Sequence, residues 1–375
     1  MPMLTYTVQR ATRASRIAAV LGAILLAVAV TLPWWGGTVA MRSVVEISCY
    51  LVFASMWNLL AGYGGMVSIG QQGFLGLGGY FLFVFAQTMG INPFVSVALA
   101  AGVAALIAVP TSQFVFRLQG GYFAVGTWVM SEVFRLTFAN VSSLGGGSGT
   151  SLTVMVGIPK ATREMITYWM SLGSVVFAVG LVYGLLRSRF GLALTAIRDS
   201  ERAAATQGID VKATKLIVYV LASFGAGLAG ALYYLSNLRI SPDVAFSVNW
   251  TAFSIFIVLI GGIGTIEGPI LGALLFWLLN NYLSDYGSWY LIGLGLMAIV
   301  VITRWPQGIW GSLSAKFGWQ LFPVQRRFLL SHRTDSRDSP SSPDSPDSPN
   351  SPSSPDSPDA FGSTHPQLRN IERMP

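Results

Sequence analysis

Apolar residues run along this chain in long segments, which are separated by short connections rich in glycine, proline or charge. A helix needs about 20 apolar residues to cross the hydrocarbon core of a membrane, so the pattern predicts an all-α integral membrane protein. We expect about ten transmembrane helices, near residues 17–35, 43–61, 66–88, 93–116, 121–139, 166–186, 216–236, 250–262, 268–283 and 288–303. The segments at 250–262 and 268–283 are short, so eight full spans plus a re-entrant pair is the alternative.

Composition agrees with a membrane protein. Only 10% of the residues are charged, against about 25% in an ordinary globular domain, and residues 47–116 contain no Asp, Glu, Lys or Arg. A water-facing surface would not tolerate so long an uncharged run, which excludes a soluble fold. The single cysteine, Cys49, is expected to serve as a small apolar residue.

The basic residues are sorted by side of the membrane, which predicts the topology. Lys and Arg near the ends of spans stay cytoplasmic. With both termini inside, the cytoplasmic side receives Arg10, Arg13, Arg16, Arg117, Arg187, Arg189, Arg198, Arg202, Lys212, Lys215, Arg304, Lys316, Arg326 and Arg327, and the outer side only Arg42, Lys160, Arg163 and Arg239. Because these charges are not gathered into a patch, we expect no nucleic-acid partner.

The chain is predicted to have three regions. Residues 1–16 form a basic cytoplasmic arm, residues 17–311 the transmembrane domain with a charged cytoplasmic loop at 187–215, and residues 312–375 a cytoplasmic tail. From about residue 331 the tail contains Ser-Pro-Asp repeats with almost nothing apolar to bury. We expect that part to be disordered.

Two glycine-rich stretches interrupt the apolar pattern. In the first, residues 58–80, glycine recurs every third residue from Gly70, which allows another helix or a substrate to approach the backbone. Polar residues share this stretch: Asn58, Ser68, Gln71 and Gln72. Either hydrogen bonding between helices or lining of a transport pathway explains them. Gly73 is a candidate for the same pathway or for a close approach of another helix. The second, residues 261–269, contains Gly261, Gly262 and Glu267; we expect an accessible turn carboxylate, with a gating role as the alternative.

Glu132 and Arg135 are an ionisable pair inside a predicted span, three residues apart on one helical face. An isolated charge at that depth costs several kcal/mol, so we expect mutual pairing toward the interior of the bundle. A structural clamp is favoured over a proton relay, because no histidine or further acid follows nearby.

Catalytic machinery is missing from the sequence. There is no Gly-Lys dipeptide and hence no phosphate-binding loop of the Walker type. His332 and His365 both lie in the tail, so the membrane body lacks the commonest general base and zinc ligand. We expect a transport protein with no catalytic residue, metal or cofactor of its own; a membrane enzyme acting on lipid is the rival from another class.

The loop 187–215 carries a resemblance to a known family. Residues 191–210, both glycine-rich turns, Ile240-Ser241-Pro242-Asp243 and residues 305–311 together resemble the permeases of branched-chain amino acid ABC transporters, over roughly residues 40–311 and in the larger of the two permease types. The Ser-Pro-Asp tail lies outside the resemblance.

The resemblance implies a subunit of an ABC importer in the bacterial inner membrane. Its loop would supply a coupling helix to the ATPase, with Arg198, Asp199, Glu201, Arg202, Ala203, Ala204 and Gly208 as the contacting segment. The three alanines from Ala203 favour a helix that Gly208 can end in a left-handed cap. The family's loop pattern begins with an acidic residue. In this sequence Glu201 stands one position before the place where that acid is expected.

The resemblance also implies the partners: a second permease, two cytoplasmic P-loop ATPases that bind ATP and Mg, and an external substrate-binding protein. The outer loops at 142–157 and 237–249 are candidates for docking that protein. Branched-chain or related small neutral amino acids are the expected cargo. Urea or short amides, and an ion-coupled secondary carrier using Glu132, remain alternatives.

Overall fold

The computed structural model describes residues 5–9, 13–283, 286–317 and 327–331. The predicted disorder from about residue 331 therefore falls almost wholly outside the described residues. The strands β1 (Thr5–Gln9) and β4 (Arg327–Ser331), which precede and follow the helical region in the sequence, pair with each other. Everything between them that bears on function belongs to one compact unit, Thr7–Leu329.

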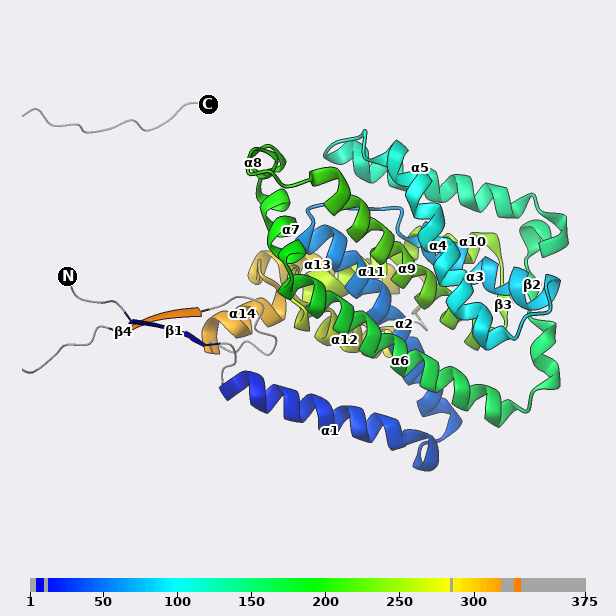
Figure 1. The fold of residues 1–375 in the computed structure, drawn as a ribbon. Helices are drawn as coiled ribbons and strands as arrows, with labels where there is room; N and C mark the ends of the chain where they lie inside the picture. Colours follow the sequence, from blue (N-terminus) through cyan, green and yellow to red (C-terminus); the bar gives the residue numbers. More distant parts are fainter. Residues whose placement is uncertain (1–4, 10–12, 284–285, 318–326, 332–375) are drawn as a thin grey trace, which may run out of the picture. The chain divides into compact units, whose positions relative to one another are not determined.

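Helices account for nearly all of this unit (Figure 1). They are α1 (Arg13–Trp35), α2 (Thr38–Asn58), the π-helix η1 (Leu59–Tyr63), α3 (Gln72–Phe83), the π-helix η2 (Val84–Thr88), α4 (Pro93–Val115), α5 (Gly121–Ala139), α6 (Lys160–Arg187), α7 (Arg189–Asp199), α8 (Glu201–Thr206), α9 (Val211–Asn237), α10 (Pro242–Ala245), α11 (Val248–Gly261), α12 (Glu267–Leu283), α13 (Ser288–Arg304) and α14 (Gly308–Phe317). Short 3-10 turns, η3 (Ser142–Leu144), η4 (Gly146–Ser148) and η5 (Thr153–Gly157), fill the α5–α6 connection.

Six helical stretches among the described residues are long and apolar enough to cross a membrane. They are Thr38–Tyr63, Pro93–Val115, Lys160–Arg187, Val211–Asn237, Pro242–Gly261 and Ile292–Ser314. The mostly helical, membrane-spanning class is thus confirmed, while the total of ten spans stays a prediction.

One predicted span differs from the structure. The span expected at 66–88 begins as a non-helical segment, residues 65–70, and becomes helical only at Gln72. The amide groups of Ile69 and Gly70 both donate to the Thr127 hydroxyl of α5, at 3.2 Å each, so a neighbouring helix supplies the bonds that this backbone lacks.

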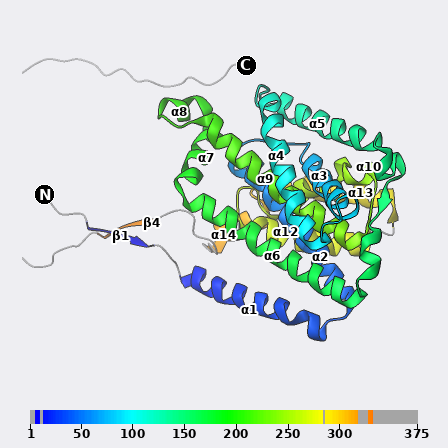
Figure 2. The same ribbon diagram turned by 45° about the vertical axis from the view of Figure 1, so that its right-hand side comes forward.

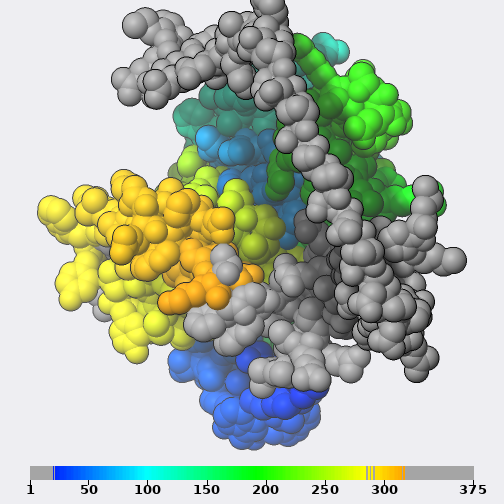
Figure 3. All heavy atoms as spheres, turned by 90° about the vertical axis from the view of Figure 1, so that its left-hand side faces the viewer, coloured from blue at the N-terminus to red at the C-terminus, as the bar shows by residue number. Residues whose placement is uncertain are grey.

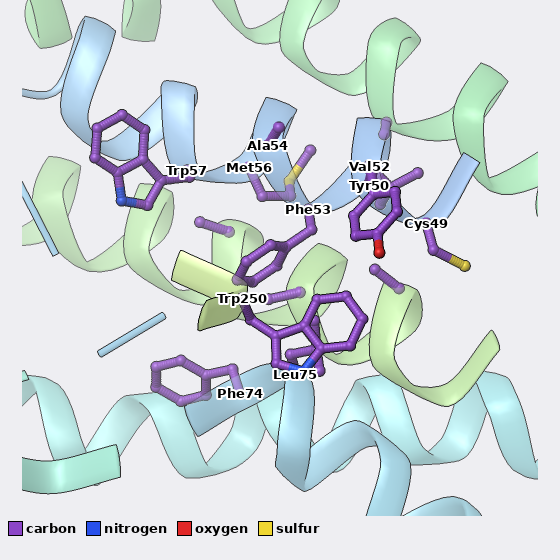
Figure 4. Packing of buried hydrophobic residues seen from close by; sticks show 14 of the residues in the cluster. Cys49, Tyr50, Val52, Phe53, Ala54, Met56, Trp57, Phe74, Leu75 and Trp250 are labelled. Atoms are coloured by element: carbon purple, nitrogen blue, oxygen red, sulfur yellow. The ribbon is translucent and has the colours of Figure 1, made fainter. Parts of the chain in front are cut away.

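The core is built around α2, whose residues from Ser48 to Asn58 are all buried. Tyr50 of α2 packs against rings of other helices, because its ring centroid lies 5.0 Å from that of Phe276 and 5.7 Å from that of Trp250. Figure 4 labels Tyr50 and Trp250 in this packing. Helix α9 crosses α3 at Gly78, which lies outside the three-residue repeat of glycines that starts at Gly70. A Cβ on Gly78 would overlap the carbonyl of Gly227, so the two backbones touch there.

The two ends of the bundle carry different segments. Helices α7 and α8 lie at one end, and the strands β2 (Thr150–Ser151) and β3 (Arg239–Ile240), which pair antiparallel, lie at the other (Figure 1). Helix α1 runs along the outside against α6 (Figure 2). The loops predicted to face opposite sides of the membrane are therefore at opposite ends of the molecule.

Candidate functional site

The charged loop 187–215 folds into the two short helices α7 and α8. The Ser188 hydroxyl accepts a bond from the Phe190 amide, and the Ser200 hydroxyl accepts one from the Ala203 amide at 3.3 Å, so each helix starts at a serine cap. Leu194 and Ile197 of α7 are buried against the bundle. Figure 3 shows these helices from the end of the molecule, in green.

Helix α8 ends as the sequence predicts. Gly208 adopts φ +81°, and the Ile209 amide donates to the Ala204 carbonyl across it at 3.2 Å. Nothing surrounds the Gly208 Cβ position, so the left-handed backbone is what requires glycine there. Glu201 forms an ion pair with Lys215, which ties α8 to α9, while Arg202 is exposed.

The two glycine-rich stretches, about 200 residues apart in the chain, meet next to this loop. Asn58 Nδ2 donates to the Thr265 carbonyl at 2.8 Å, and Asn58 Oδ1 accepts from the Gly264 amide at 2.9 Å. A Cβ on Gly62 would overlap Asn58 Oδ1 and lie 2.7 Å from the Gly264 amide nitrogen. The Asn58 side chain therefore locks the end of α2 to the turn between α11 and α12.

Arg198 connects the loop to the end of η1. Its Nη1 donates to the Gly62 carbonyl at 3.0 Å and lies 3.8 Å from the Cβ position of Gly264. Gly65, with φ +67°, passes close to the arginine, because a Cβ there would lie 3.2 Å from Arg198 Cγ. Asp199 accepts a bond from Arg198 Nε at 3.3 Å. We call Asn58, Gly62, Arg198, Gly264 and Thr265 the junction.

The turn at 261–269 differs from one expectation. Glu267 lies in the first turn of α12 and is only 9% exposed, so it is not the accessible turn carboxylate that we expected. The turn is packed too tightly to leave the Glu267 side chain in water. A Cβ on Gly261 would overlap the Gly268 carbonyl, and a Cβ on Gly268 would overlap the Gly262 carbonyl. A gating role for Glu267 remains a prediction.

The remaining polar residues of the first stretch are buried in the bundle. The Ser68 carbonyl accepts from Trp57 Nε1 at 2.8 Å, Gln71 Nε2 donates to the Ala222 carbonyl at 3.1 Å, and Gln72 bonds to Thr251. Gln71 Oε1 and Gln72 Nε2 have no hydrogen-bond partner among the described residues. In this conformation these residues join helices; their proposed contact with substrate stays a prediction.

Gly73 allows a close approach by α5, because a Cβ there would lie 3.2 Å from the Ser131 Cα. Sequence reasoning missed Thr127 and Thr251, which hold the non-helical segment and Gln72. Each is one of several hydroxyl side chains on its helix, a signal shared with many residues that only bond to their own helix.

Glu132 and Arg135 pair as predicted, at 2.5 Å between Glu132 Oε1 and Arg135 Nη2. The expected direction was wrong, however, because the Glu132 side chain is 43% exposed and faces outward. Asp243 of α10, which the sequence did not suggest as a partner, lies 2.6 Å from Arg135 Nη1. The pair is therefore part of a three-residue cluster, Glu132–Arg135–Asp243, that links α5 to α10.

A small polar hollow lies at the end of the bundle opposite to α7. Arg42 Nη2 and Glu164 Oε1 are 2.8 Å apart, and the buried Glu164 Oε2 and Thr167 hydroxyl have no hydrogen-bond partner within the part of the chain that the structure describes. The hollow holds about 20 Å³, which is room for a water molecule. Among the described residues, no group of His, Cys, Asp and Glu is arranged to hold a metal ion.

The six apolar helical stretches, each long enough to cross a membrane, define the class as a multi-span membrane protein. The sequence profile of the family described as "branched-chain amino acid transport system / permease component" matches residues 39–303, so the chain belongs to that family. It is thus a multi-pass membrane permease component.

Individual relatives agree with the family. The chain is 27% identical over 319 residues to the high-affinity branched-chain amino acid transport system permease protein LivM of Escherichia coli, covering 76% of this chain and 73% of that protein. It is 28% identical to the probable LivM of Methanocaldococcus jannaschii, over 45% of this chain and 50% of that protein. It is also 28% identical to the ribose import permease protein RbsC of Escherichia coli, over 58% of this chain and 70% of that protein. No solved structure matches.

Proposed function

We propose that this chain is the membrane-spanning subunit of an ABC importer that carries branched-chain or related small neutral amino acids into the cytoplasm of a bacterium. Both termini would lie on the cytoplasmic side of the inner membrane. The LivM relatives support the cargo, since the resemblance to E. coli LivM covers 76% of the chain, against 58% for the ribose permease.

The observation that carries the proposal is the hydrogen bond from Arg198 of α7 to the Gly62 carbonyl, which connects the loop to the rest of the junction. The loop helices lie at the end predicted to be cytoplasmic, where an ATPase would bind. A movement of α8 and α7 would pull on the Gly62 carbonyl and, through Asn58, on the turn between α11 and α12. Rigid helices transmit such a shift because packed interfaces switch between discrete arrangements.

The remaining partners follow from the same assembly. A second permease would complete the membrane part, two P-loop ATPases with their ATP and Mg would bind the loops, and an external binding protein would dock near β2 and β3. Since Glu201 already pairs with Lys215, the exposed Arg202 is the better candidate for the direct contact with an ATPase. This chain itself would perform no covalent chemistry.

The test is ATP-driven uptake of labelled leucine by the complete complex in proteoliposomes. Charge reversal in Arg198→Glu removes a charge-assisted bond worth about 1.5–3 kcal/mol, and Gly208→Pro forbids φ +81°. We expect each to lower uptake about tenfold or more. Lys212→Gln, which removes a charge from the same loop at an exposed position, is the matched control and should transport normally.

Unchanged uptake and unchanged ATPase association in both the Arg198→Glu and the Gly208→Pro variant would contradict the proposal. Uptake that continues without ATPases but stops when the ion gradient is dissipated would establish the secondary carrier. Competition by urea or short amides, without competition by valine or isoleucine, would change the cargo.

A further inference from the structure

The polar hollow at the end of the bundle opposite to α7 lies where three helices meet. The start of α2 contributes Arg42, and the end of α9 contributes Ser236. The start of α6 contributes Arg163, Glu164 and Thr167. The Arg42 side chain is 57% exposed, so the hollow reaches the surface of the molecule and is accessible to a ligand.

Two buried oxygen atoms in the hollow lack a hydrogen-bond partner. Glu164 is only 9% exposed, and Arg42 Nε and Nη2 both donate to its Oε1, at 3.1 and 2.8 Å. Its other oxygen, Oε2, and the hydroxyl of Thr167, which is 3% exposed, form no hydrogen bond with the described residues. Because buried polar atoms are nearly always paired, we expect a group from outside the chain to donate hydrogen bonds here.

Arg163 brings a positive charge that is not neutralised. Its half-buried side chain lines the same hollow and forms no ion pair or side-chain hydrogen bond within the described part of the chain. Arg42 and Glu164 neutralise each other through their ion pair, so Arg163 leaves the hollow with an excess of positive charge. A guanidinium group pairs best with a carboxylate or a phosphate. The ligand should therefore carry an anionic group as well as hydrogen-bond donors.

The size of the hollow limits the donor group. The hollow holds about 20 Å³, which is room for one water-sized group. A primary ammonium group is of this size and has three N–H donors, so it can reach both Glu164 Oε2 and the Thr167 hydroxyl. A water molecule would also donate to these oxygens, but it would leave Arg163 without an anion. An ammonium group with an anion beside it satisfies all three side chains.

We propose that the hollow binds a small zwitterion, with its ammonium group on Glu164 Oε2 and Thr167 Oγ1 and its anionic group on Arg163. The expected occupant is a free amino acid at the end of the bundle that is predicted to face outward. That choice rests on the proposed function, which supplies this cargo. The head group of phosphatidylethanolamine, an ammonium beside a phosphate, has the same chemistry and is the other source that the experiment must distinguish.

The experiment measures the binding of radiolabelled leucine to the full chain in nanodiscs of phosphatidylcholine, a lipid whose head group has no N–H donor. Unlabelled glycine and glycine betaine serve as competitors. Both carry the same two charges, but the trimethylated nitrogen of betaine is larger and cannot donate a hydrogen bond. We expect glycine to displace leucine and betaine not to displace it.

Variants of the hollow test the residues. Arg163→Gln removes the cation, and Thr167→Val removes the hydroxyl while keeping the shape of the side chain. Each should weaken leucine binding about tenfold or more, because hydrogen bonds to charged groups are among the strong ones. Arg239→Gln is the matched control, since it removes an exposed arginine at the same end of the bundle that does not line the hollow. It should bind leucine as the unaltered chain does.

Equal displacement by glycine and betaine, or unchanged leucine binding in both Arg163→Gln and Thr167→Val, would overturn the inference. If leucine does not bind, the apparent unfolding temperature is compared between phosphatidylethanolamine and phosphatidylcholine nanodiscs. A rise in phosphatidylethanolamine that Arg163→Gln abolishes would uphold the zwitterion site with the lipid as its occupant, and no rise would overturn it.

ATP-driven uptake by the unaltered complex separates the two proposals. A complex that takes up leucine while the hollow fails these tests would keep the proposed function and lose the inference. A hollow that binds leucine as expected in a complex without ATP-driven uptake would contradict the proposed function alone.

Discussion

At the junction, neighbouring atoms determine which residue type a position can hold. Gly62 lies in the π-helix η1 with ordinary helical geometry, so its backbone does not require glycine. Its surroundings do, because Asn58 and the Gly264 amide occupy the space of a side chain. Gly102 in α4, by contrast, has nothing within 4 Å of its Cβ position.

These two glycines allow a matched test. Gly62→Ala must push the junction apart, and overpacking of this kind costs about 1–3 kcal/mol, so the apparent unfolding temperature in detergent should fall. Gly102→Ala should leave it unchanged or raise it, since alanine is favoured over glycine in helices by about 1 kcal/mol. Equal shifts in the two variants would show that the junction is not packed as described.

Among the elements, the non-helical segment at 65–70 depends on its neighbours most directly. Two of its amides share the hydroxyl of Thr127 on α5, and the Ser68 carbonyl is held by Trp57 of α2. An interrupted helix at membrane depth is possible only because side chains of intact helices replace the missing backbone bonds.

Thr127→Val keeps the shape of the side chain and removes the hydroxyl oxygen that accepts hydrogen bonds from the Ile69 and Gly70 amides. Leaving a buried amide unpaired costs about 1–3 kcal/mol, so amide hydrogen exchange in the peptide that covers Ile69 and Gly70 should become faster. Thr137→Val is the control, because the exposed Thr137 hydroxyl bonds only to its own helix. Unaltered exchange in the Thr127 variant would mean that these bonds do not hold the segment.

For the whole molecule, the separation of α8 from the α5–α6 connection makes the orientation testable. In a Cys49→Ser background, Thr206→Cys on α8 and Ser148→Cys in the connection are both exposed. We expect a membrane-impermeant maleimide to label Ser148→Cys in spheroplasts and Thr206→Cys only in inverted vesicles, since basic loops stay inside. The reverse pattern would invert the topology and place α7 and α8 outside.

The sequence by itself determined the membrane environment, most helix positions, the capped helix α8 and the pairing of Glu132 with Arg135. These properties depend on composition and on residues a few positions apart, which a linear pattern records. Only the tertiary structure decided that Asn58 bonds to a turn about 200 residues away, that Arg198 bonds to the Gly62 carbonyl, that Glu267 is buried, and that Glu132 faces outward beside Asp243. A helix that is apolar on all sides has no periodicity to indicate which face turns inward, so packing against distant segments decides it.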